Sequence, residues 1–147
     1  MKAPKFLALI VALTTLPSYA DQADVQLGRQ WAKCSQQAKI LQRLSKDADE
    51  SKKLKKVSAL LRIYSEAAAG KSASLAEESK TEAEFIHRVP LESPAKVAVF
   101  AKAFTQQAQV DAKVCSDSFE KHGSRFDEEV RQILKRSRIH TSAADHK

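Results

Sequence analysis

Two cysteines and four histidines are the side chains of this sequence best suited to redox or metal chemistry. Cys34 and Cys115 lie far apart in the chain, so the C-x-x-C spacing of a redox motif is absent. An isolated pair of cysteines in one domain predicts a disulfide bond when the protein works in an oxidising compartment. A redox pair or a metal site is the alternative for these two thiols.

The histidines do not form a recognisable metal or haem motif. None lies four residues from another histidine or from a cysteine, and the C-x-x-C-H sequence that attaches c-type haem is absent. The only methionine is Met1, at the extreme N-terminus, so it offers no axial haem ligand. We therefore expect no metal and no cofactor. The four residues are His87, His122, His140 and His146.

Motifs for nucleophilic or phosphate chemistry are also missing. There is no G-x-S-x-G, and three glycines in 147 residues leave little material for a nucleophile turn or a phosphate-binding loop. Acidic runs such as Glu77–Glu78 and Asp127–Glu129 suit a solvated helix face or a helix N-terminus. The sequence therefore favours a protein that is not an enzyme.

Two further groups of residues are candidate binding sites. A basic group near the C-terminus would suit an anionic membrane or protein surface, and its alternative is the solvated side of a bundle helix. An aromatic group would suit a pocket for a hydrophobic ligand between helices, and its alternative is the core. The basic group is Arg131, Lys135, Arg136 and Arg138, and the aromatic group is Trp31, Phe100 and Phe104.

The first twenty residues have the three parts of a secretory signal peptide. Lys2 and Lys5 precede an apolar run from Phe6 to Leu16, and small residues lead to Ala20. The apolar run is shorter than the about 20 residues that cross a bilayer. We expect cleavage after Ala20 and a soluble periplasmic or secreted protein. Cleavage removes two positive charges from a net charge of +7, so the remaining domain is modestly basic.

The rest of the chain is expected to be helical, and its helices must position these residues. Ala, Lys, Glu, Gln and Leu dominate it, and no segment alternates apolar and polar residues as a half-buried strand does. We predict an all-α fold: a single domain over residues 21–140 that forms a four- to five-helix bundle, followed by a flexible tail over 141–147. The expected helices are 24–47, 54–69, a weaker accessory helix over 74–88, 94–122, and 124–140.

Helical periodicity predicts which faces are buried. Cys34 lies on an apolar stripe of the first helix and Cys115 on one of the fourth, so the disulfide would join these two helices. In the accessory helix the apolar residues are expected to face inward and the glutamates outward. The inward set is Leu75, Ala83 and Ile86, the outward set is Glu77, Glu78, Glu82 and Glu84, and Gln37 is expected on the polar face of the first helix.

Export, a disulfide and the lack of catalytic motifs favour a protein that acts by binding another envelope or secreted protein. An adaptor, an inhibitor, an immunity-type partner and a chaperone all fit this description. The alternatives are a carrier of a small hydrophobic ligand and a membrane-surface protein that docks through its basic last helix. Nucleic acid is disfavoured as a partner, because aromatic residues are few and the charge is mixed.

Overall fold

The structure is a computed structural model, and it describes residues 19–144. These residues form five α-helices and one short 3₁₀-helix, and the predicted all-α fold is confirmed. Most of the predicted signal peptide (residues 1–18) and the end of the predicted tail (145–147) lie outside the described residues. The elements are α1 (Tyr19–Leu44), α2 (Ala48–Ala69), α3 (Lys71–Arg88), α4 (Pro94–His122), η1 (Gly123–Phe126) and α5 (Asp127–Ala144).

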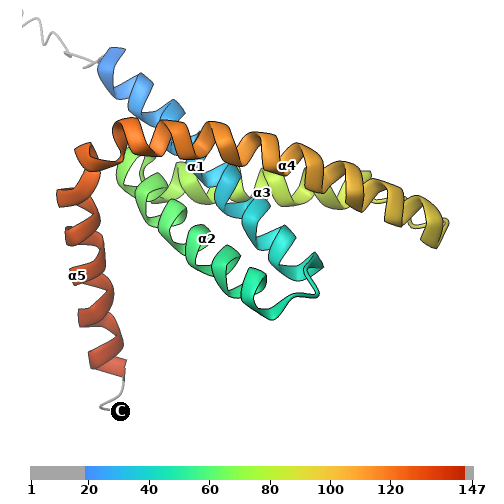
Figure 1. Ribbon diagram of the computed structural model, residues 1–147. Helices are drawn as coiled ribbons and strands as arrows, with labels where there is room; N and C mark the ends of the chain where they lie inside the picture. The colour runs from blue at the N-terminus through green and yellow to red at the C-terminus, as the bar shows by residue number, and fades with distance from the viewer. Residues whose placement is uncertain (1–18, 145–147) are drawn as a thin grey trace, which may run out of the picture.

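The first three helices lie side by side and form the body of the molecule (Figure 1). The helix α1 contacts α2, α3 and α4, whereas α4 runs along the body and contacts α1 and η1. At η1 the chain turns, and α5 extends away from the body with α2 as its neighbour. This arrangement leaves a groove on one side of α2 and a cleft on the other.

The helix boundaries follow from local chemistry. The side chain of Asp47 caps α2 by accepting hydrogen bonds from the backbone N–H groups of Glu50 and Asp49, and these bonds lower the pKa of Asp47. Gly70 separates α2 from α3, and its φ of 83° is a backbone conformation that residues with a side chain rarely adopt. Pro94 opens α4, although Ser93 before it makes no capping side-chain hydrogen bond.

Small side chains bring α1 and α2 into close contact. Gly28, Ala32 and Ser35 are buried along one stripe of α1, and Ser65 is buried on α2. A Cβ atom added at Gly28 would lie 2.5 Å from the Cβ of Ala69 and 2.7 Å from its backbone N. Because the second of these atoms belongs to the backbone of α2, no change of rotamer can relieve the contact.

We expect Gly28→Ala to lower the free energy of unfolding by about 1 to 3 kcal/mol, because the two helices must separate. In an open helix the same change stabilises by about 1 kcal/mol. Chemical denaturation followed by circular dichroism measures the difference. Gly123→Ala is the control, because the atoms nearest to a Cβ there belong to the side chain of Phe119, at 3.3 Å, and not to a backbone. A gain of stability in Gly28→Ala would contradict the prediction.

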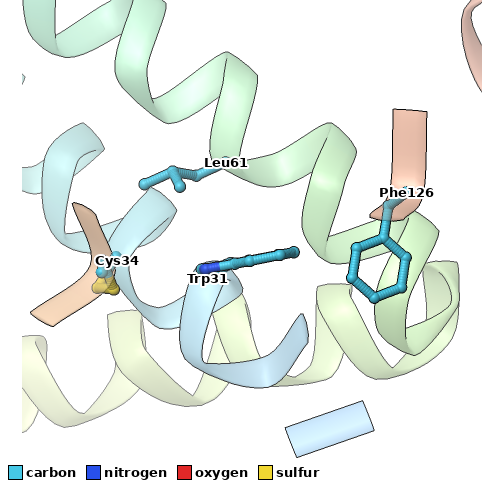
Figure 2. Close-up of a cluster of buried hydrophobic side chains, with 5 residues drawn as sticks. Trp31, Cys34, Leu61 and Phe126 are labelled. Atoms are coloured by element: carbon cyan, nitrogen blue, oxygen red, sulfur yellow. A yellow bond between two sulfur atoms is a disulfide. The ribbon is translucent and has the colours of Figure 1, made fainter. Parts of the chain in front are cut away.

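An aromatic cluster centred on Trp31 joins four elements. Trp31 is 0% exposed, and its ring meets those of Tyr64, Phe119 and Phe126 edge to face. Its indole Nε1 donates a hydrogen bond to Ser118 Oγ at 2.9 Å. Figure 2 shows Trp31 with Phe126 on one side and a cysteine of the disulfide on the other. This cluster is the core that holds α1, α2, α4 and η1 together.

The buried face of α3 is polar, contrary to the prediction. Leu75 and Ile86 are 39% and 61% exposed, whereas Glu78 is 6% exposed and lies on the inner face with Ser74 and Thr81. Polar groups on α1 and α2 make this burial possible, because they hydrogen-bond to Glu78 and Ser74 of α3. The expected position was also wrong for Gln37, which is buried although it was expected on the polar face of the first helix.

Candidate functional site

Cys34 and Cys115 form a disulfide that joins α1 to α4, as the sequence predicts. Both residues are buried, at 6% and 2% exposed, and the chain has no free cysteine. The thiols are therefore not available as nucleophiles or metal ligands in this state. A disulfide is typical of proteins that work in oxidising compartments.

The disulfide lines an apolar groove between α1, α2 and α4, with a volume of about 240 Å³. On the α2 side the large apolar side chains of Val57 and Leu60 are 47% and 46% exposed. On the α4 side the exposed residues Ala112 and Ser116 are small. The rest of the lining is Cys34, Gln37, Ala38, Leu41, Leu54, Leu61, Ala108, Cys115 and Phe119.

Two lysines border this groove on α2. Lys53 precedes Val57 by one helical turn and Lys56 precedes Leu60 by one turn, so each lysine lies beside an exposed apolar residue. Both lysines are exposed, and neither makes an ion pair within residues 19–144. The α2 edge of the groove is therefore apolar with a positively charged margin.

A buried carboxylate lies where α1, α2 and α3 meet. Ser35 Oγ donates to Glu78 Oε1 at 3.1 Å, and Lys39 Nζ lies 3.0 Å from Glu78 Oε2. Arg62 Nε approaches the same oxygen at 4.0 Å. The carboxylate is thus held by a hydrogen bond and two cations, an arrangement that suits a structural role. Sequence periodicity missed this site, because its partners come from two other helices.

A larger cleft lies on the other side of α2, toward α5, with a volume of about 730 Å³. Residues of α1, α2, the start of α3 and α5 line it. This cleft was not predicted from the sequence, since no one segment contributes more than half of its lining. The signal that was available is the pair Lys55 and Arg62, which are two turns apart on α2 and share one face.

The predicted basic group lies on the exposed surface of α5 and lines neither the groove nor the cleft. Arg131 Nη1 donates to Glu128 Oε2 at 2.8 Å on the same helix, and Arg136 Nε donates to the backbone oxygen of Gln132. The charges are therefore partly balanced within α5. The group is Arg131, Lys135, Arg136 and Arg138.

The structure does not bring the predicted aromatic group together. Trp31 belongs to the core cluster, whereas Phe100 and Phe104 contact Phe85, with ring centroids 5.5 and 4.8 Å away. These three phenylalanines line a separate cavity of about 500 Å³ between α1, α3 and α4. As for metal sites, the described residues contain no cluster of three or more His, Cys, Asp or Glu side chains that could hold an ion.

A tyrosine fixes the start of α5 to α2. Tyr64 Oη donates a hydrogen bond to Asp127 Oδ1 at 2.6 Å. This bond to a carboxylate, together with burial, raises the pKa of Tyr64 above its usual 10.0. Phe126, directly before Asp127, and Val130, one turn after it, are both buried, with 6% and 8% of their surface exposed. The orientation of α5 thus depends on contacts in its first turns.

The raised pKa of Tyr64 predicts a pH dependence. Since the folded-state pKa exceeds the unfolded value, the bond stabilises fully below about pH 10 and its contribution is lost as the pH rises through the folded pKa. We expect Tyr64→Phe to lower the free energy of unfolding by about 1 to 2 kcal/mol at neutral pH and to make no difference above that pKa. In a Tyr19→Phe variant Tyr64 is the only tyrosine. An ultraviolet titration of that variant with a midpoint at or below 10.0 would contradict the assignment.

No helix within residues 19–144 combines the length and the apolar character needed to cross a membrane. Comparison with protein-family models, with curated proteins and with solved structures found no match.

Proposed function

We propose that this protein is exported and acts as a non-enzymatic binding protein for another envelope or secreted protein. Its groove would accept the apolar side of an amphipathic helix from that partner. The observation that carries the proposal is the pair Val57 and Leu60, which stand half exposed on an apolar groove that the disulfide lines. Large apolar side chains grouped at a groove are typical of protein-binding surfaces.

The size of the groove favours a protein partner over a small ligand. Its volume of about 240 Å³ is below the roughly 300–1,000 Å³ of small-molecule sites. A groove of this size accommodates one or two side chains of a helix, whose backbone would lie along the rim. The small residues Ala112 and Ser116 on α4 leave space for such an approach.

The charges at the rim indicate the chemistry of the partner. Lys53 and Lys56 have no carboxylate partner within the described residues, so acidic side chains beside the apolar stripe of the partner would pair with them. Such pairs at the rim of an interface contribute mainly to association rate and to specificity. The proposed partner is therefore an amphipathic helix with an acidic margin.

The expected export is consistent with this proposal. The basic and apolar N-terminus has the pattern of a signal peptide, and the disulfide suits an oxidising compartment. We therefore propose a periplasmic or secreted location, where the partner would also be found.

Photo-crosslinking in the producing cell tests this function. A benzophenone side chain in place of Leu60 should form a discrete adduct with one partner protein. The matched control replaces Val99, which is also apolar and exposed, at 71%, but lies outside the groove. Adducts of equal yield at both positions, or none at Leu60, would contradict the proposal.

A charge variant separates specific docking from hydrophobic adhesion. We expect Lys53→Glu combined with Lys56→Glu to reduce the Leu60 adduct by about tenfold, because the acidic margin of the partner would then be repelled. Lys135→Glu combined with Arg136→Glu changes the same net charge on α5 and should leave the yield unchanged.

A further inference from the structure

We propose that the cleft between α2 and α5 is a second, separate binding site, and that it takes a single-chain anionic amphiphile. The ligand would have a carboxylate or phosphate head and one alkyl chain. This site does not depend on the groove, and it uses different residues from the basic group on the outer surface of α5.

One wall of the cleft is cationic. The helix α1 contributes only polar side chains to it, two of them basic, and α2 adds Lys55 and Arg62. Lys71, at the start of α3, lies at the same cleft. Among the described residues that line it, Glu66 is the only acid. The five basic residues are Lys39, Arg43, Lys55, Arg62 and Lys71.

The carboxylates of α3 neutralise only part of this positive charge. Glu78 lies beyond the lining and is shared by Lys39 and Arg62, and Glu82 pairs with Arg43 at 2.8 Å. Lys55 and Lys71 make no ion pair within residues 19–144. With Glu66 included, five basic residues thus face three acids, and two cations remain for an anionic head to bind.

The opposite wall is apolar. The helix α5 contributes Ile133 and Leu134 to the cleft, with Ser137 one turn further on, and Ile63 of α2 continues the apolar surface. Leu134 is 40% exposed, so the wall is open to solvent when the cleft is empty. A bare anion would leave these side chains in contact with water, and a neutral alkyl chain would leave the lysines without a counter-charge. An amphiphile satisfies both walls.

The size of the cleft fits a whole small molecule. About 730 Å³ lies within the roughly 300–1,000 Å³ typical of ligand sites and exceeds the volume of the groove threefold. The faces of α2 also separate the two sites. Lys55 lines the cleft, whereas Lys53, two residues earlier, lies beside Val57 at the groove. This pair of lysines provides a charge variant and its matched control on one helix.

Isothermal titration calorimetry of the full chain tests the proposal with dodecanoate below its micellar concentration. We expect binding of one dodecanoate per chain, and binding at least about tenfold weaker for inorganic phosphate and for the neutral dodecyl maltoside. Lys55→Glu and Ile133→Ser should each weaken dodecanoate by about tenfold, whereas Lys53→Glu should leave it within about twofold. Circular dichroism of each variant verifies that it folds.

Any of the following results would overturn the proposal. Equal binding of phosphate or of the maltoside would remove the need for the apolar or the cationic wall, respectively. An equal effect of Lys53→Glu and Lys55→Glu would indicate unspecific attraction of anions. Binding to anionic vesicles without binding of monomeric dodecanoate would assign the charges to a membrane surface. Leu60→Glu changes the groove and not the cleft, so dodecanoate binding should be unchanged in that variant. The calorimetry therefore tests the cleft alone, and the Leu60 crosslinking experiment tests the proposed function alone.

Discussion

Removal of the Cys34–Cys115 disulfide is expected to lower the free energy of unfolding by about 4.5 kcal/mol. The two cysteines are 81 residues apart, and the bond removes from the unfolded chain the conformations in which this long loop is open. The cysteine side chains are also buried in the core beside Trp31. Few single changes in a domain of this size have a comparable effect.

The position of α4 explains why the bond also matters for the proposed function. The backbone of α4 comes close to that of α1 and η1, but within the described residues not to that of α2, α3 or α5. The groove, however, lies between α4 and α2. Because the disulfide is the covalent link that holds α4 to α1, its loss should widen the groove and weaken a partner that needs both walls.

Denaturation by guanidinium chloride measures the first effect. We compare wild-type protein with and without reductant, and with a Cys34→Ala/Cys115→Ala variant. The variant should match the reduced protein and should not respond to reductant. A loss below about 1 kcal/mol would contradict the prediction. Photo-crosslinking from Leu60 should fall in the variant under conditions where circular dichroism shows that it remains folded.

The helices and the disulfide could be predicted from sequence because their signals are local. Gly70 and Pro94 interrupt the chain at two helix ends, and the structure begins or ends helices at both. Cys34 and Cys115 could be paired because each lies on an apolar stripe of its own helix. This link could be predicted from the repeat of apolar residues along each helix. How the two helices cross did not have to be known.

The interior of α3 could not be predicted, because burial of its polar face depends on distant partners. Apolar spacing favoured Leu75 and Ile86 as inward residues. The carboxylate of Glu78 is buried instead, since Lys39 and Ser35, about forty residues earlier, provide a cation and a donor. Periodicity describes only one helix at a time, and this interaction involves three.

The two candidate sites were missed for a related reason. Val57 and Leu60 are large apolar residues of a predicted helix, yet the structure leaves both half exposed because α4 does not cover that side of α2. The cleft combines side chains of four helices, and its apolar wall exists only because α5 turns away after η1. Neither site follows from any one segment of the sequence.

Trp31→Ala is expected to lower the free energy of unfolding by about 3 to 5 kcal/mol. The side chain is fully buried and meets three aromatic rings from three other elements, so its removal leaves a cavity that no neighbour can fill without shifting a helix. Trp31→Phe retains an aromatic ring but loses the hydrogen bond to Ser118, and it should cost much less. Circular dichroism is the appropriate measurement, since Trp31 is the only tryptophan.

The same substitution should also weaken the attachment of α5. Phe126 packs on Trp31 immediately before α5 begins, and Tyr64 contacts both Trp31 and Asp127. Loss of the indole therefore loosens both attachments of α5, while the disulfide still links α4 to α1. We expect faster amide exchange in the first turns of α5 and weaker dodecanoate binding. If Trp31→Ala were as stable as Trp31→Phe, or if amide exchange in α5 were unchanged, the cluster would not be the support of α5 that its geometry indicates.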